Sequence, residues 1–243
     1  MDTFLTKPGL FRTFVFFSET KFPMIRTVIF DMDGVIVDTE PVHRYAFFKH
    51  FDELGLHITD EEYATFTGLS TRNVYQKLNE AYNLGEDIES FVLRKRAIFN
   101  DAFDEKEDLD LLDGVRTLIE DLHQHGFQLI LASSAAKVTI ARVFKRFGLD
   151  PYFSDKVSGE DFVRSKPDPA IFEHAASLSK APKSECIIIE DSNNGVKAAR
   201  AAGIYCIGYN SEHTALQDLS EANQVINHFS ELNAEKIRAI VTE

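Results

Sequence analysis

The sequence is poor in cysteine, and its two cysteines do not form a recognisable motif. Cys186 and Cys206 stand apart without a C-x-x-C partner. The sequence therefore predicts neither a disulfide framework nor a thiolate zinc site. Because a free cysteine packs as a small hydrophobe, we expect two buried, reduced thiols and a cytoplasmic location, where reducing conditions keep such thiols free.

Clustered positive charge and long apolar runs are also missing. The 243 residues include 26 Lys and Arg against 39 Asp and Glu, which gives a formal net charge of -13. Nucleic acid binds concentrated positive charge, and an anionic membrane surface repels an acidic protein. No apolar run approaches the roughly 20 residues that span a bilayer. We expect neither a nucleic-acid nor a membrane partner, and we expect a monomer.

The first 23 residues contain six phenylalanines without alternation or helical spacing. Met24 lies immediately before the first clear strand. The segment 1–23 is therefore either a consequence of the choice of start site or an extra element that packs on the core. We expect it to be a leader without a catalytic role.

Beyond Met24, short apolar runs alternate with segments of helical periodicity. The runs at 26–30, 127–132, 186–189 and 204–208 are typical of strands that are buried on both faces. Helices are predicted at 115–125, 138–147 and 195–202, each followed by a glycine. This alternation predicts an α/β fold with a Rossmann-like, doubly wound parallel sheet.

Residues 39–109 interrupt the alternation. They contain no convincing strand, and their apolar residues recur at spacings of three and four, as on one face of a helix. We expect an all-helical cap domain at 39–109, inserted into an α/β core formed by 24–38 and 110–243. An insertion directly after a strand lies over the carboxyl edge of the sheet, where open α/β folds bind ligands.

Polar residues gather where the predicted strands end. Because the carboxyl ends of parallel strands share one edge of the sheet, these side chains are expected to converge. A lysine opens the helix that precedes the strand at 186–189. The set comprises Asp31, Asp33, Ser133, Lys166, Glu190 and Asp191.

Four carboxylates beside one lysine call for a compensating cation. Mg²⁺ is the natural choice, because it prefers oxygen ligands and commonly binds together with substrate phosphate. Lys166 would then balance the charge of a phosphoryl group, and Ser133 would donate a hydrogen bond to it. Asp31 is suited to accept the phosphoryl group as an aspartyl-phosphate.

These residues, in this order and spacing, resemble the four motifs of the haloacid dehalogenase superfamily of phosphatases and phosphomutases. The resemblance extends from Met24 to the end of the chain. The segment D-M-D-G-V-I-V-D-T-E-P at 31–41, followed by a helical insertion, is similar to the β-phosphoglucomutase-like branch. Asp33 favours phosphoryl chemistry, because the dehalogenases of the superfamily lack this second aspartate.

The resemblance implies a role for each matching residue. Asp31 would be the nucleophile and Asp33 the general acid and base. The metal would be held by Asp31, the backbone carbonyl of Asp33, Asp191 and Glu190, while Ser133 and Lys166 would bind the transferring phosphoryl group. Substrate contacts are expected from Thr39, His43, Arg72 and Ser134.

Simpler interpretations stand beside these roles. Ser133 and Ser134 also suit helix capping, Lys166 also suits the protein surface, and Glu190 also suits a role in orienting Asp191. His43 is equally typical of an exposed helix position.

The resemblance leaves two activities open, a phosphatase and a mutase that converts β-glucose 1-phosphate to glucose 6-phosphate. A mutase must hold a second phosphate near the cap. Thr71 stands where the mutase has an arginine, and Ala135 and Lys137 replace a serine and an asparagine. We therefore expect a phosphatase for a small phosphorylated metabolite, with a sugar phosphate as the favoured class.

Two other classes of protein were weighed. A response-regulator receiver also forms an aspartyl-phosphate, but it is about half this length, has no cap, and carries its phosphoacceptor after a later strand. A catalytically silent scaffold is disfavoured by the intact motifs.

Overall fold

The computed structural model describes residues 24–66, 69–85, 87–210 and 217–241. The predicted leader at 1–23 lies outside these ranges. Cys186 and Cys206 are buried free thiols, as expected. Within the described ranges, no helix combines the length and apolar composition needed to cross a membrane.

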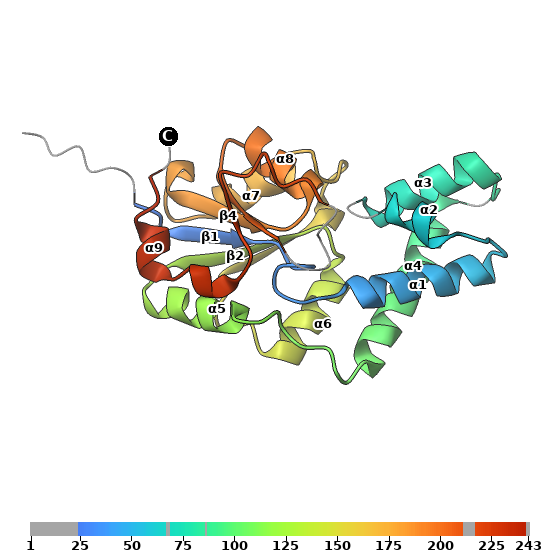
Figure 1. The fold of residues 1–243 in the computed structure, drawn as a ribbon, viewed down its shortest axis with the longest axis horizontal. Helices are drawn as coiled ribbons and strands as arrows, with labels where there is room; N and C mark the ends of the chain where they lie inside the picture. The colour runs from blue at the N-terminus through green and yellow to red at the C-terminus, as the bar shows by residue number, and fades with distance from the viewer. Residues whose placement is uncertain (1–23, 67–68, 86, 211–216, 242–243) are drawn as a thin grey trace, which may run out of the picture.

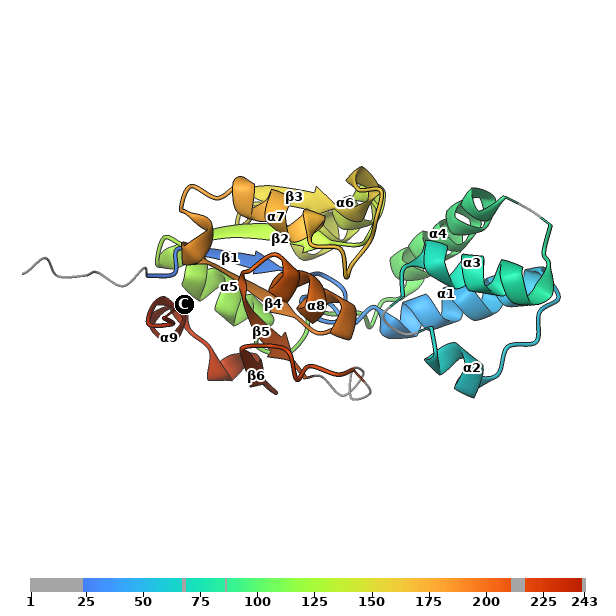
Figure 2. The same cartoon turned by 90° about the horizontal axis from the view of Figure 1, so that it is seen from above.

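A parallel sheet forms the centre of the larger part of the molecule (Figures 1 and 2). Its strand order is β3-β2-β1-β4-β5-β6, and every neighbouring pair runs parallel. The predicted doubly wound α/β fold is confirmed. The strands are β1 (Thr27–Phe30), β2 (Gln128–Ser133), β3 (Asp155–Ser158), β4 (Cys186–Glu190), β5 (Tyr205–Tyr209) and β6 (Gln224–Ile226).

Helices cover both faces of the sheet, because alternate strand residues point to opposite sides. Val28 and Phe30 of β1 join one apolar cluster, and Ile29 joins the other. The first cluster involves α5 (Val115–Gln124), α6 (Lys137–Phe147) and α9 (Ala234–Arg238); the second involves α7 (Ala170–Ser177) and α8 (Asn193–Ala201). Short 3₁₀ turns occur at η1 (Gly159–Asp161), η2 (Lys183–Glu185) and η4 (Phe229–Glu231).

Four helices between β1 and α5 form a separate group beyond the carboxyl ends of the strands (Figure 2). Together we call them the helical module. It has its own apolar core, which includes the buried rings of Phe51, Tyr75 and Phe91. Its helices are α1 (Glu40–Glu53), α2 (Asp60–Ala64), α3 (Thr71–Tyr82) and α4 (Ile88–Glu105).

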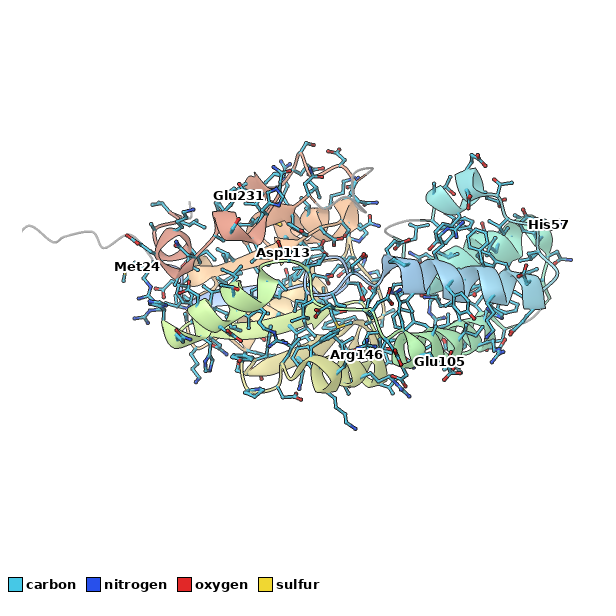
Figure 3. The ribbon with its side chains drawn as sticks, turned by 60° about the horizontal axis from the view of Figure 1, so that its bottom comes forward. Met24, His57, Glu105, Asp113, Arg146 and Glu231 are labelled. Atoms are coloured by element: carbon cyan, nitrogen blue, oxygen red, sulfur yellow. The ribbon has the colours of Figure 1, made fainter. Side chains whose placement is uncertain are left out.

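The chain passes between the sheet and the helical module twice, and the two passages are paired. Val37 and Leu111 form an antiparallel bridge, and the amide of Leu112 donates to the carbonyl of Ile36 at 3.0 Å. Arg146 on α6 lies at the end of α4 (Figure 3), where its guanidinium donates to the carbonyl of Phe103 at 2.6 Å. These contacts set the position of the helical module over the sheet.

Candidate active site

The strand order places a crevice between β1 and β4. On one side of this point the chain continues from β1 to β2 and β3, and on the other side it continues from β4 to β5 and β6. Ligands of open α/β sheets bind at such switch points, outside the carboxyl ends of the strands. Here a cavity of about 650 Å³ lies between this edge and the helical module, with lining residues from both. The predicted site residues Asp31, Asp33, Lys166, Glu190 and Asp191 all line it.

The centre of the site is a buried ion-pair network. The ammonium Nζ of Lys166 lies 2.6 Å from Asp31 Oδ1 and 2.9 Å from Glu190 Oε1, and it also donates to the carbonyl of Ala132 at 3.2 Å. The other oxygen of Glu190 accepts the amide and the hydroxyl of Ser192. Both oxygens of Glu190 are therefore engaged, which fixes its orientation.

Burial and like charge shift the pKa values of these groups. Removal from water raises the pKa of Asp31 to about 7, with Glu190 and Asp33 raising it and Lys166 opposing the rise. Burial, with Glu190 and Asp31, also raises the pKa of Asp191 well above its usual range. Burial opposes the charge of Lys166, but Asp31 and Glu190 raise its pKa above the usual value. Lys166 is thus a fixed cation, but its single positive charge is too small to balance the negative charges of the buried carboxylates around it.

Two glycines leave the space that these carboxylates occupy. A Cβ atom on Gly34, whose φ is +78°, would lie 2.0 Å from Asp191 Oδ2. A Cβ atom on Gly195, at the start of α8, would lie 1.7 Å from Glu190 Oε1. Side chains at either position would displace the acidic groups, so the glycines are part of the site's construction.

The carboxylates are arranged as a hard cation would require. Asp31, Glu190 and Asp191 each offer an oxygen, and these oxygens lie within 4.8 Å of one another in a buried setting. Oxygen donors of this kind suit Mg²⁺. One lysine cannot offset three acidic groups, so the donor set and its charge fit the predicted metal.

Asp33 lies in a different environment from Asp31. Its Oδ1 accepts the hydroxyl of Thr39 at 2.6 Å and lies 3.7 Å from His43 Nε2. Burial opposes ionisation of Asp33, but its contacts with His43 and Thr39 and the charge of Lys95 outweigh it and lower the pKa. Thr39 and His43 therefore reach the site: both line the cavity, and both contact Asp33.

Lys95 on α4 joins this group and had no role assigned from the sequence. Its Nζ lies 2.6 Å from His43 Nδ1 and over the rings of Phe47 and Phe99. His43 therefore lies between Lys95, at its Nδ1, and Asp33, which faces its Nε2 at 3.7 Å. The sequence feature that indicates a buried position for Lys95 is its spacing of four residues from both Phe91 and Phe99, which places it on the buried face of α4.

The two serines after β2 differ in their surroundings. Ser133 is fully buried, and its Oγ accepts the amide of Ala135 at 3.0 Å. Ser134 lines the cavity, as do Ala135 and Ala136. Ser134 is among the residues that line the cavity and Ser133 is not, and the contacts predicted for both serines remain predictions.

Arg72 also lines the cavity, with its guanidinium paired to Glu89 of α4. A second arginine, Arg96, lines the same wall and pairs with Glu160 of η1 at 2.7 Å. The sequence indicates Arg72 as a site residue, but it indicates neither Glu89 as the partner of Arg72 nor Glu160 as the partner of Arg96. In each pair the two residues lie far apart along the chain.

Comparison with known proteins agrees with this geometry. The model of the haloacid dehalogenase-like hydrolase family matches residues 28–209. The chain belongs to this family. The hydrolase is 30% identical over 184 residues to a phosphorylated carbohydrates phosphatase of Thermotoga maritima, a match that covers 74% of this chain and 82% of the relative. It is also 30% identical over 179 residues to a fructose-1-phosphate phosphatase of Escherichia coli, covering 73% and 92%.

Solved structures share the fold of the hydrolase. A β-phosphoglucomutase from Clostridium difficile superposes with a TM-score of 0.76 at 25% identity, covering 88% of this chain and 96% of the other. CbbY from Rhodobacter sphaeroides gives a TM-score of 0.79 at 24% identity, covering 89% and 100%, and shows the fold alone. The family and branch predicted from the motifs are confirmed.

Proposed function

We propose that the hydrolase is a Mg²⁺-dependent phosphatase that acts on a small phosphorylated metabolite through an aspartyl-phosphate on Asp31. The observation that carries this proposal is the buried pairing of Asp31 with Lys166, directly beside Asp191 and open to the cavity. Its phosphatase relatives support the same chemistry.

In the first step, a carboxylate oxygen of Asp31 attacks phosphorus as the bond to the leaving oxygen breaks. Lys166, 2.6 Å from Asp31, favours the ionised form of the nucleophile against the effect of burial and lies where it can also offset phosphoryl charge. Ser133, Ser134 and the amides that follow β2 are the proposed donors to the phosphoryl oxygens. Bound Mg²⁺ would supply charge neutralisation among the carboxylates and on the phosphoryl group, held by Asp31, the carbonyl of Asp33, Asp191 and Glu190.

Asp33 is the proposed general acid and base. In the described site its pKa is lowered, so the group is a carboxylate. A phosphate dianion brought beside Asp33 raises this pKa and favours the protonated form that a general acid needs. After the proton passes to the leaving oxygen, Asp33 takes one from water, whose oxygen attacks the aspartyl-phosphate and frees Asp31 and inorganic phosphate.

A sugar phosphate is the proposed substrate class. The cavity of about 650 Å³ is larger than a phosphate alone requires and is lined by hydroxyl and amide side chains such as Ser70, Thr71 and Gln76. Such groups suit a polyhydroxylated leaving group. Two relatives named for carbohydrate phosphates point to the same class.

We also propose that residues 39–109 act as a cap domain over a core of 24–38 and 110–243. The separate apolar cluster of the helical module and the paired passages at Val37 and Leu111 support this division. A monomeric, cytoplasmic enzyme remains our expectation.

Activity with Mg²⁺ tests the proposal directly. Purified protein should release phosphate from p-nitrophenyl phosphate and from members of a sugar-phosphate panel. Asp31→Asn should lose this release by at least about 10³-fold, as expected for loss of a covalent nucleophile. A rapid acid quench should show one phosphoryl group on the wild-type chain and none on Asp31→Asn.

Asp150→Asn is the matched control, because Asp150 is an exposed aspartate that pairs with Lys156 at the surface. It should behave as wild type. Phosphate release that survives in Asp31→Asn would contradict the proposal. Conversion of β-glucose 1-phosphate to glucose 6-phosphate without free phosphate would instead establish the mutase alternative.

A further inference from the structure

The wall of the cavity that belongs to the helical module carries arginines that are already paired. Arg72 on α3 pairs with Glu89 on α4. Arg96 on α4 pairs with Glu160 on η1 at 2.7 Å, so this second pair joins the helical module to the sheet side of the cavity. Glu160 also accepts the amide of Lys137 at 2.9 Å, which holds its carboxylate in place. All four of these charged side chains line the cavity.

The charge of the whole lining is unfavourable for a second phosphate. Among the described residues, eight acidic and five basic side chains line the cavity. Bound Mg²⁺ would offset two of these negative charges, and the phosphoryl group that reacts at Asp31 would add negative charge again. A second dianion would need cationic donors that are free to bind it, whereas Glu89 and Glu160 hold the two arginines of this wall and repel an anion.

Part of the remaining lining suits an uncharged group. Leu69, Phe162 and Val163 line the cavity, and Val163 is fully exposed. Arg164, the next residue, also lines the cavity and is paired with Asp168 at 2.7 Å. Apolar side chains and paired ions together favour a substrate whose non-reacting part has no charge of its own.

We propose that Glu89 and Glu160 are specificity-determining residues that restrict the enzyme to substrates with one phosphate group. This inference rests on the proposed phosphatase function and narrows it: phosphate monoesters with a neutral remainder are substrates, and bisphosphates are excluded. Glu89 and Glu160 act through Arg72 and Arg96, by keeping each guanidinium from a distal phosphate.

Substitution of these carboxylates should leave the fold intact. Both ion pairs are partly exposed to solvent, and such pairs contribute little to stability. Glutamine keeps the shape of the side chain and can still accept the amide of Lys137. Changed specificity can therefore be separated from unfolding, and the thermal midpoint of each variant should stay close to that of wild type.

Fructose 1-phosphate and fructose 1,6-bisphosphate form a suitable pair of probes. In wild type, kcat/KM for the monophosphate should exceed that for the bisphosphate by at least tenfold. In the double variant Glu89→Gln/Glu160→Gln, this ratio should fall at least tenfold, through a lower KM for the bisphosphate. Adding Arg72→Gln and Arg96→Gln should restore the preference, because the freed cations are then gone.

Glu53→Gln is the matched control. Glu53 pairs with Arg94 on the same module but does not line the cavity, so its loss should leave the ratio unchanged. Calorimetric binding of both probes to Asp31→Asn in Mg²⁺ measures the discrimination without turnover. If wild type hydrolyses neither probe but Asp31→Asn still binds the monophosphate at least tenfold more tightly than the bisphosphate, the phosphatase proposal is refuted. The proposed role of Glu89 and Glu160 in excluding a second phosphate is then supported. Equal or stronger binding of the bisphosphate, or a ratio unaffected by Glu89→Gln/Glu160→Gln, would overturn it.

Discussion

Two aspartates that are two positions apart along the chain are placed in opposite electrostatic environments. Asp31 is buried against Lys166 and Glu190, and burial raises its pKa to about 7. Asp33 accepts the hydroxyl of Thr39, lies near His43, and has a lowered pKa. For the proposed roles both shifts must reverse when the site is loaded: bound Mg²⁺ would lower the pKa of Asp31 and favour the ionised nucleophile, and a phosphate dianion would raise the pKa of Asp33 and favour the protonated acid.

Asp33→Asn is expected to separate the two chemical steps. It should lower kcat for alkyl phosphates by about 10²- to 10⁴-fold, the usual contribution of general acid–base catalysis. p-Nitrophenol is a good leaving group that needs little protonation, so Asp33→Asn should still form the phosphoenzyme from its ester and hydrolyse it slowly. Rapid-quench kinetics should show a burst of p-nitrophenol; equal impairment of burst and steady state would contradict the assignment.

Lys95 should make the stability of the protein depend on pH. Burial lowers the pKa of Lys95 to about 7 in the folded state, whereas in the unfolded chain it stays near its ordinary value. Between these values the unfolded state binds more protons, so stability rises with pH above 7. Lys95→Met should remove a gain on the order of 2 kcal/mol between pH 7 and pH 9, since one pKa unit corresponds to about 1.4 kcal/mol.

Urea unfolding of both proteins at pH 7, 8 and 9 measures this difference. Contributions from titrating groups away from Lys95 are common to both proteins and cancel in the comparison. Arg94→Met, at an exposed neighbouring position of α4, serves as the control. Parallel pH profiles for wild type and Lys95→Met would show that Lys95 is not held in its neutral form.

At the scale of elements, α4 and α6 connect the helical module to the sheet domain. Arg96, Asn100 and Asp104 follow one another at spacings of four along α4, so they share one face. They contact Glu160, Thr139 and Arg142, the last two on α6. This polar seam, rather than an apolar interface alone, fixes the angle between the two parts.

Arg146 closes the same seam at the end of α4. Its guanidinium donates to the carbonyl of Phe103, one of the last carbonyls of α4, which the helix end leaves without a partner, and to the carbonyl of Leu109 in the segment after the helix. Arg146→Ala should lower the free energy of unfolding by about 2 kcal/mol, the scale of hydrogen bonds from a charged donor. Lys145→Ala changes the adjacent, exposed residue and should have little effect in the same denaturation experiment; equal losses in both variants would argue against this role.

The sequence predicted those elements whose pattern is long and uniform. The apolar runs of β1, β2, β4 and β5 and the amphipathic faces of α1, α3 and α4 were all recognisable. The edge strands β3 and β6 were assigned no residue range, because they are short and partly polar. The five-residue helix α2 is too short for periodicity to be detected.

The same distinction holds in the site. Asp31, Glu190 and Asp191 could be placed from the sequence because parallel strands end at one edge, whatever the details of packing. The contacts of Lys95 and the pairing of Arg96 with Glu160 could not. They depend on how the helical module rests on the sheet, and no local pattern encodes that geometry.

At the scale of the whole molecule, the excess of acidic residues has a local counterpart. The chain has a net charge of -13, and three of its carboxylates converge within 4.8 Å at the junction of the two parts. Uncompensated burial of these groups opposes folding. A bound cation should therefore stabilise the native state as well as enable the reaction.

Mg²⁺ is expected to raise the thermal midpoint of the metal-free protein. A ligand that binds only the folded state stabilises it by about 2.7 kcal/mol when present at 100 times its dissociation constant. Asp191→Asn should abolish this stabilisation, because it removes one of the converging oxygens, whereas Asp150→Asn should retain it. Thermal unfolding of EDTA-treated protein over a Mg²⁺ titration measures the shift, and the midpoint of this titration should match the Mg²⁺ dependence of phosphate release. An equal shift in wild type and Asp191→Asn would place the cation elsewhere on this acidic protein.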